Sequence, residues 1–125
     1  MKLTIIRGVP GSGKSTIAKT INAIQVEADQ FAIDHFGEYY WDIKKSGIYH
    51  KKCFELCEKL LSENKNVVCS NTFITNKSIL PYLELAKQHN ADFEVIEAKG
   101  NFKSIHVSIQ IVNRMRDKYE EFNLY

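Results

Sequence analysis

The sequence predicts one α/β domain of three layers, in which a four-stranded parallel sheet is flanked by helices. Apolar runs of strand length recur along the chain, and segments with helical spacing of apolar residues separate them. The chain has 125 residues, the usual size of one domain, and no repeat or Pro/Gly/Ser-rich linker divides it. We therefore expect residues 1–125 to form a single domain.

The elements follow in alternating order. Strands are expected at 3–7, 25–28, 66–70 and 93–98. Helices are expected at 15–24, 48–62, 76–88 and 111–122. Pro81 lies inside the third helix, and because proline is tolerated only near a first turn, that helix is expected to begin later than it looks. Alternation of this kind gives parallel strands with crossover helices, so ligands are expected at the carboxyl ends of the strands.

Residues 8–15 read Gly-Val-Pro-Gly-Ser-Gly-Lys-Ser, a complete G-x-x-x-x-G-K-[ST] phosphate-binding loop. The loop follows an apolar strand and opens a helical pattern, which is the context that such a loop requires. Its glycines allow backbone N–H groups to face a phosphate. Lys14 is expected to contact the β- and γ-phosphates, and Ser15 to join the coordination of Mg²⁺. The other nucleotide-binding residues expected here are Gly8, Pro10, Gly11, Ser12 and Gly13.

The rest of the chain narrows the class of P-loop protein. A switch GTPase needs an Asn-Lys-x-Asp motif, which this sequence lacks. A motor or AAA-type ATPase needs an apolar strand ending in Asp-Glu, whereas the third expected strand here runs into Ser70-Asn71-Thr72. A compact kinase remains, and the predicted fold is therefore a three-layer P-loop NTPase/kinase fold.

A kinase needs a base for the acceptor hydroxyl. Asp29 is the first acid after the second expected strand, at the edge shared with the phosphate loop, and we expect it to be that base. Glu27 stays an alternative because the register of the short strand is not fixed. Asp29 could equally cap a short helix over 31–36.

Further short segments occur in a characteristic order along the chain. They are Arg-Gly-Val-Pro-Gly-Ser-Gly-Lys-Ser-Thr at 7–16, Glu-Ala-Asp-Gln-Phe at 27–31, Gly-Glu-Tyr-Tyr at 37–40, His-Lys-Lys-Cys at 50–53, Ser-Asn-Thr at 70–72, Asn-Phe-Lys-Ser-Ile-His-Val at 101–107 and Arg-Met-Arg-Asp-Lys-Tyr-Glu at 114–120. In this series the chain resembles the P-loop polynucleotide 5′-kinases, which include the kinase half of phage polynucleotide kinase/phosphatase and small stand-alone relatives. The resemblance covers nearly the whole chain.

The resemblance implies an ATP- and Mg²⁺-dependent kinase that phosphorylates the 5′-hydroxyl of DNA or RNA. It places Thr16 with Lys14 and Ser15 at the phosphates, and Asp29 at the acceptor hydroxyl. It implies a lid at about 99–110 that closes over ATP and supplies a basic group. It assigns Asn71 and Thr72 to the acceptor groove. It offers Lys103 or His106 as the basic group of the lid. We expect Lys103 to be a catalytic residue and His106 to lie at the acceptor as well.

Three further residues have both a functional and a structural interpretation. Tyr40 belongs to an aromatic run after Gly37, which either stacks on bases of the acceptor or closes one end of the core. His50 either contacts the acceptor or fixes a loop. Arg114, or Arg116 as an alternative on the opposite face, either reaches ATP from the last helix or lies on a solvated face.

Two other functions stay open. The net charge is only +2, and Ala32 stands where the phage enzyme has an arginine for the acceptor phosphate. Both features favour a nucleoside, nucleotide or other small metabolite as acceptor. A shortened lid favours a non-catalytic nucleotide-binding protein that interacts with a partner.

The surroundings of the chain are predicted from its composition. No membrane segment or signal peptide is recognised, and the longest apolar runs are far shorter than the roughly 20 residues of a membrane helix. Cys53, Cys57 and Cys69 form no metal-ligand pattern, and the first two are expected to be buried small hydrophobic groups. A reduced, cytoplasmic protein of a bacterium or phage-infected cell is the resulting expectation.

Overall fold

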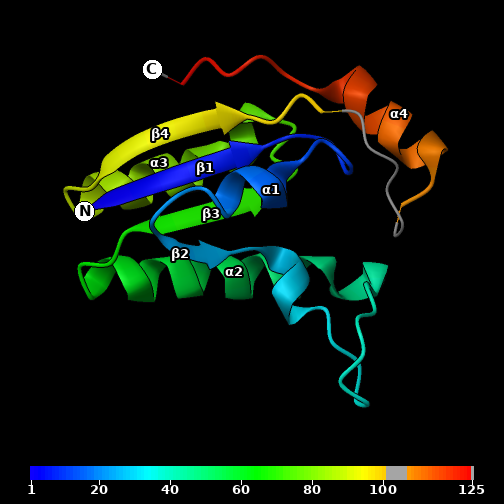
Figure 1. Cartoon of the computed structure of the whole chain (residues 1–125), viewed down its shortest axis with the longest axis horizontal. Helices are drawn as coiled ribbons and strands as arrows, with labels where there is room; N and C mark the ends of the chain where they lie inside the picture. The colour runs from blue at the N-terminus through cyan, green and yellow to red at the C-terminus, as the bar shows by residue number, and fades with distance from the viewer. Residues whose placement is uncertain (101–106, 125) are drawn as a thin grey trace.

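The computed structural model describes residues 1–100 and 107–124, which contain a four-stranded parallel sheet with helices on both faces (Figure 1). The strands, in the spatial order β2-β3-β1-β4, are β1 (Lys2–Arg7), β2 (Ile24–Val26), β3 (Val67–Asn71) and β4 (Asp92–Glu97). The helices are α1 (Lys14–Ala18), α2 (Ser46–Ser62), α3 (Asn76–Gln88) and α4 (Ile109–Lys118), with 3-10 turns η1 (Ala28–Phe31) and η2 (Ile43–Lys45). The predicted fold class is confirmed.

The two faces of the sheet bury different sets of side chains because successive residues of a strand point in opposite directions. Leu3 and Ile5 of β1 belong to a large core that α2 and α3 complete. Ile6 points to the opposite face and packs in a smaller cluster with Ala18 of α1. The sheet is thus the middle layer of three.

The register brings the ends of three strands to one edge. Arg7, the last residue of β1, pairs with Asn71 at the end of β3 and with Glu97 at the end of β4. In Figure 1 the strand arrows point toward this edge, where the phosphate loop, the segment before α2 and α4 also lie. Every loop that follows a strand therefore begins beside the phosphate loop.

Two predicted helices are longer than the real ones. The first ends at Ala18 rather than residue 24, because Thr20 bonds through both its N–H and its hydroxyl to the carbonyl of Ile17 and tightens the chain into a turn. The last ends at Lys118 rather than 122. Tyr119 is extended, and the N–H of Glu120 donates to the carbonyl of Ile74, so a tertiary contact replaces the next helical turn.

The prediction that Pro81 delays the start of α3 is wrong. The helix begins at Asn76, and the hydroxyl of Thr75 caps it by accepting the N–H of Ser78. Pro81 stands inside the helix and is exposed, while the opposite face buries Ile79. Capping and burial of the apolar face thus offset the hydrogen bond that proline removes.

Among the residues described, no helix combines the length and the apolar character needed to cross a bilayer.

Candidate nucleotide and acceptor site

The phosphate loop closes on itself through local hydrogen bonds and two left-handed glycines. Gly11 and Gly13 have φ of 81° and 93°, a region that L side chains rarely adopt. The N–H of Ser12 donates to the carbonyl of Val9 at 3.1 Å, and the carbonyl of Ser12 accepts the N–H of Gly100 at 2.9 Å. The loop is therefore fixed to the segment that follows β4.

Gly8 is a position where no side chain fits. A Cβ built there would lie 2.8 Å from the carbonyl oxygen of Ala98 and 2.3 Å from Oγ of Ser12. The Ser12 hydroxyl is itself buried and has no hydrogen-bond partner among the described residues. An unsatisfied buried hydroxyl beside a curled glycine loop fits the binding of a phosphate or another polar ligand group.

Lys14 folds back over the loop. Its Nζ donates to the carbonyls of Gly8 and Val9 at 2.9 and 3.2 Å. Burial lowers the pKa of Lys14, and the negative charges of Asp29 and Glu27 oppose that shift. Both candidate bases therefore lie close enough to Lys14 to act on its charge.

Asp29 lies in the first turn of η1, directly after β2. Oδ1 of Asp29 accepts a hydrogen bond from the Tyr39 hydroxyl at 3.2 Å. Burial and the charge of Asp29 raise the pKa of Tyr39 to about 12, so this hydroxyl stays a donor at neutral pH. Glu27, not Asp29, occupies the position that precedes the 3-10 turn. That turn ends at Phe31 and no helix follows over 32–36, so the interpretation of Asp29 as a helix cap is wrong.

Glu27 differs from Asp29 in its surroundings. It is partly buried, and burial together with the charge of Asp29 raises its pKa. Asp29 is exposed to solvent at the same edge. An exposed carboxylate beside Lys14 is the better placed of the two to meet an acceptor hydroxyl.

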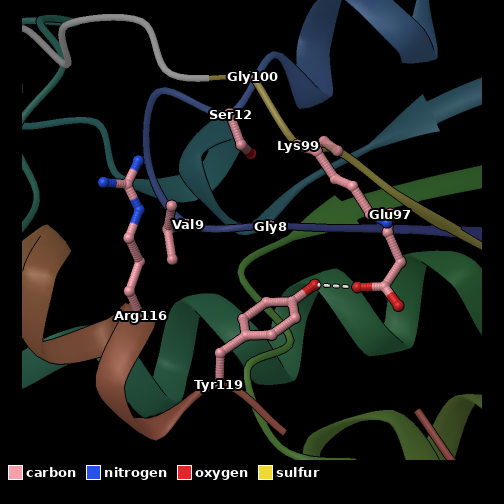
Figure 2. A pocket seen from close by; sticks show the side chains of 9 residues that line it. Gly8, Val9, Ser12, Glu97, Lys99, Gly100, Arg116 and Tyr119 are labelled. Carbon is pink, nitrogen blue, oxygen red and sulfur yellow. Dashed lines mark hydrogen bonds between the residues drawn. The ribbon is translucent and has the colours of Figure 1, made fainter. Parts of the chain in front are cut away.

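A hollow of about 410 Å³ opens beside the phosphate loop (Figure 2). Arg116 reaches it from α4 on one side, while Glu97 and Lys99 reach it from the end of β4 on the other. Arg114, which the sequence favoured, is not among the residues that line it. The full lining is Gly8, Val9, Ser12, Glu97, Ala98, Lys99, Gly100, Arg116 and Tyr119.

The wall of this hollow is held by the buried guanidinium of Arg7. Nη2 donates to the carbonyl of Glu120 at 2.7 Å, and Nε donates to the carbonyl of Phe73 at 3.0 Å. Nη1 lies 3.7 Å from Oε1 of Glu97, and the guanidinium carbon lies 4.1 Å from the centre of the Tyr119 ring. Tyr119 in turn donates to Glu97 at 2.7 Å. Arg7 therefore joins the end of β1 to the chain that follows α4.

A second hollow, of about 500 Å³, lies between α2 and α3 at the end of β3. It includes three of the predicted acceptor residues, His50, Asn71 and Thr72, and its largely apolar wall contains the rings of Phe54, Phe73 and Tyr82. Its full lining is His50, Phe54, Asn71, Thr72, Phe73, Ile74, Ser78, Pro81 and Tyr82. One hydrogen bond joins a residue of each hollow, because the N–H of Gly8 in the first donates to the carbonyl of Thr72 in the second at 3.1 Å.

Asn71 faces inward rather than toward solvent. Its Oδ1 accepts the backbone N–H of Ala28 at 2.9 Å, and its Nδ2 donates to the sulfur atoms of Cys53 and Cys69 at 3.5 and 3.7 Å. Because Ala28 precedes Asp29, this side chain fixes the backbone beside the candidate base.

The remaining predicted residues occupy separate places. Ser15 and Thr16 are exposed in the first turn of α1, directly after Lys14. Tyr40 is exposed and does not line either hollow. Lys103 and His106 lie outside the described residues.

Sequence spacing missed a cysteine cluster. It offers no third ligand beside Cys53 and Cys57, but the fold brings Cys69 of β3 against α2, and the three Sγ atoms lie within 4.8 Å of one another. All three are free and buried. Burial raises the pKa of the Cys69 thiol, which favours a neutral group packed in the core.

Sequence reasoning also missed the roles of Glu97 and Tyr119. A signal for Glu97 exists, since it is an acid at the end of a strand that is predicted to run parallel to the strand of Arg7. No local signal marks Tyr119, because the extended conformation that brings it to Arg7 depends on tertiary contacts.

The sheet, the phosphate loop and the flanking helices define a P-loop domain with a kinase-like fold. Residues 3–112 match the family AAA_33, described as an AAA domain, and the chain belongs to that family. The sequence does not predict an AAA-type ATPase, because no expected strand ends in an Asp-Glu pair. The structure agrees on that point, since β3 ends in Ser70-Asn71, although the family is described as an AAA domain.

Three comparisons place this domain among known proteins. The chain is 30% identical to human NEDD4-binding protein 2 over 96% of its own length, and it spans only 8% of that protein. The structure resembles the Pnkp1/Rnl/Hen1 RNA repair complex with a TM-score of 0.61 and 24% identity, covering 94% of this chain and 37% of the other. It resembles the APS kinase CysC of Mycobacterium tuberculosis with a TM-score of 0.56 and 15% identity, covering 90% of this chain and 66% of the other.

Proposed function

We propose that this chain is an ATP- and Mg²⁺-dependent polynucleotide kinase that transfers the γ-phosphate to the 5′-hydroxyl of DNA or RNA. The observation that carries the proposal is the position of Lys14 and Asp29 at one edge of the sheet, where Gly8 lines one hollow and its hydrogen-bond partner Thr72 lines another. One hollow adjoins the phosphate loop and the other adjoins the predicted acceptor residues. A kinase needs this division because donor and acceptor must meet in line.

The first hollow is assigned to ATP. The amides of the phosphate loop and Lys14 hold the phosphates, and the unsatisfied Ser12 hydroxyl offers a further polar contact. Arg116 takes the role that was expected of Arg114, because it is the arginine of α4 that lines this hollow. Mg²⁺ bound through Ser15 supplies neutralisation of phosphate charge.

The second hollow is assigned to the terminal nucleoside of the acceptor. Its aromatic wall of Phe54, Phe73 and Tyr82 suits the face of a base, and Thr72 and His50 offer polar groups. The carboxylate of Asp29 accepts the proton of the 5′-hydroxyl as that oxygen bonds to the γ-phosphorus and the β–γ bridging bond of ATP breaks, releasing ADP. Tyr39 holds Oδ1 of Asp29 and leaves Oδ2 for this proton.

A nucleic-acid acceptor is supported by two comparisons of different kinds. The ordered segments of the sequence resemble polynucleotide 5′-kinases, and a structural neighbour belongs to an RNA repair complex. The fold also occurs in an APS kinase, which acts on a small substrate, so the acceptor must be established by assay.

The test is transfer of labelled γ-phosphate with Mg²⁺ to an oligonucleotide bearing a 5′-hydroxyl and, separately, to a panel of nucleosides. Lys14→Ala is the blank. We expect Asp29→Asn to lower transfer at least about 100-fold while ATP still binds, because the amide keeps the shape but accepts no proton. Asp92→Asn, at the opposite edge of the sheet, is the matched control and should transfer normally.

Each other outcome overturns a stated part of the proposal. Wild-type transfer by Asp29→Asn removes the assigned base and leaves Glu27 to be tested by the same substitution to Gln. Label on nucleosides alone replaces the polynucleotide acceptor by a small one. ATP binding without transfer to any acceptor rejects kinase activity.

A further inference from the structure

A hairpin of unusual surface character projects beside the site. Residues 33–42, here called the aromatic arm, connect η1 to η2. In Figure 1 they form the long loop below α4. Ile33 bridges Tyr39 in an antiparallel pair, and the N–H of Tyr40 donates to the carbonyl of Ala32 at 2.9 Å. The arm therefore has a defined backbone.

The tip of the arm is fixed by a carboxylate. Oδ1 of Asp34 accepts the N–H of Phe36 at 2.9 Å and of Glu38 at 3.0 Å, and Gly37 turns the chain with φ of 81°. An Asp side chain that bonds two residues onward is a common way to hold such a turn. The residues at the tip are thus presented in one orientation rather than as a loose loop.

Large apolar side chains are concentrated on the arm and just after it. Phe36 is 78% exposed, Tyr40 61%, Ile43 82% and Ile48 52%. Of the eleven exposed large hydrophobic residues in the described chain, six lie between residues 33 and 48. An exposed apolar cluster of this kind marks a binding surface more often than chance.

The arm is attached to both parts of the proposed site. Tyr39 on its returning strand bonds to Asp29. Trp41 packs on Tyr49 and His50 of α2 with ring centres 4.8 and 5.9 Å apart, and His50 lines the hollow assigned to the acceptor. A ligand that leaves this hollow past His50 meets the arm.

Four lysines follow the arm on η2 and the first turns of α2. Lys44, Lys45, Lys51 and Lys52 are all exposed, and residues 43–54 contain no acid. Ile48, Lys51 and Lys52 share one exposed face of α2 because they are spaced by three and four residues. Within the ranges 1–100 and 107–124, none of the four lysines takes part in an ion pair. These four lysines are called the lysine strip below.

We infer that the aromatic arm and the lysine strip bind the single-stranded stretch that follows the phosphorylated end of a nucleic acid. The inference rests on the proposed function and names the form of its substrate. Exposed rings stack on unpaired bases, and lysines neutralise the phosphates between them. A duplex keeps its bases stacked on each other, so it cannot use the rings. The arm itself carries Asp34, Glu38 and Asp42, and positive charge begins after it with the lysine pairs 44–45 and 51–52, which a protein partner would not require.

The experiment measures binding without ATP by fluorescence anisotropy. The probe is a single-stranded decanucleotide with a 5′-hydroxyl and a 3′ fluorophore, compared with the same sequence as a blunt duplex. Phe36→Ala combined with Tyr40→Ala should weaken binding of the single strand at least about fivefold, since each stack contributes on the order of 1 kcal/mol or more. Ile24→Ala, an exposed apolar residue at the far edge of the sheet, is the control and should bind normally.

The lysine strip is tested by the salt dependence of the same binding. Lys51→Gln combined with Lys52→Gln should reduce the slope of log affinity against log salt by about 0.7 for each phosphate that the protein no longer neutralises. Lys59→Gln with Lys87→Gln, in the last turns of α2 and α3, should leave the slope unchanged. Melting temperatures near that of the wild type will show that the exposed substitutions leave the fold intact.

The outcomes separate this inference from the proposed function. Weaker strand binding by the arm variant, with duplex binding weak throughout, supports the inference whether or not phosphate is transferred. Equal binding of wild type and arm variant, or equal binding of single strand and duplex, overturns it even if the kinase is active. Absence of any strand binding also overturns it and leaves the arm to a protein partner.

Discussion

Substitution of Arg7 by Met offers the sharpest test of how the site is held. Met keeps a long apolar stem in the buried position but removes the guanidinium. The change deletes two hydrogen bonds, to the carbonyls of Phe73 and Glu120, and the ion pair with Glu97. It also removes the cation from the Tyr119 ring.

The magnitude follows from burial. Arg7 is 0% exposed, and a hydrogen bond from a charged donor contributes about 1.5–3 kcal/mol. Loss of two such bonds costs about 3–6 kcal/mol. The ion pair with Glu97 adds less, because that side chain is 33% exposed. Since domains unfold with about 5–15 kcal/mol, Arg7→Met should remove a large part of the stability.

The same sheet supplies a matched control. Lys2 at the other end of β1 pairs with Glu94 of β4, but both of these side chains are 45% exposed. An exposed pair contributes about 0–1 kcal/mol, so Lys2→Met should change the unfolding free energy by no more than that. Both pairs join a basic side chain of β1 to a glutamate of β4, so burial is the main difference between them.

The assay is urea unfolding followed by circular dichroism, with limited proteolysis of the folded protein. Arg7→Met should lower the unfolding free energy by about 3–6 kcal/mol, and protease should cleave the segment after α4 first. Arg7→Lys keeps the charge but not the planar fork and should fall between wild type and Arg7→Met, which keeps the test usable if Met prevents folding. A decrease below about 1 kcal/mol, or one equal to that of Lys2→Met, would show that the buried contacts of Arg7 do not stabilise the fold.

Two further predictions concern the phosphate loop and the partly buried Glu27. Gly8→Ala should lower the free energy of unfolding in urea by about 1–3 kcal/mol and should abolish ATP binding. Adding Ser12→Ala should restore only part of the lost stability, because the new Cβ still clashes with the backbone carbonyl of Ala98. Burial raises the pKa of Glu27, so the folded protein holds the proton of this carboxyl more tightly than the unfolded chain does. The stability that this proton contributes is complete below pH 4.5 and is lost as the pH rises from 4.5 through the raised pKa of the folded state. Glu27→Gln should therefore unfold at higher urea than the wild type at pH 7, with the difference vanishing below pH 4.5; an equal difference at both pH values would contradict the assigned cause.

Much of the fold could be predicted because its signals are local. The alternation of apolar runs with helical spacing predicted the four strands and four helices found in the described residues, and the phosphate loop predicted the edge where ligands are expected. The errors lie at helix ends, where longer-range contacts compete with local preference. Tyr119 leaves α4 because Arg7 and Ile74 bind the chain that follows, and no pattern near residue 119 contains that information.

The candidate site likewise has parts that local signals predict and parts that depend on distant contacts. The phosphate loop and the acid at 29 could be assigned to one edge from local signals, because both follow strands in a parallel sheet. The inward position of Asn71 and the cluster of Cys69 with Cys53 and Cys57 were decided only by tertiary structure. These contacts depend on the order and register of strands that are far apart in the chain, and a side chain's partners across the sheet are set by that register rather than by its neighbours in sequence.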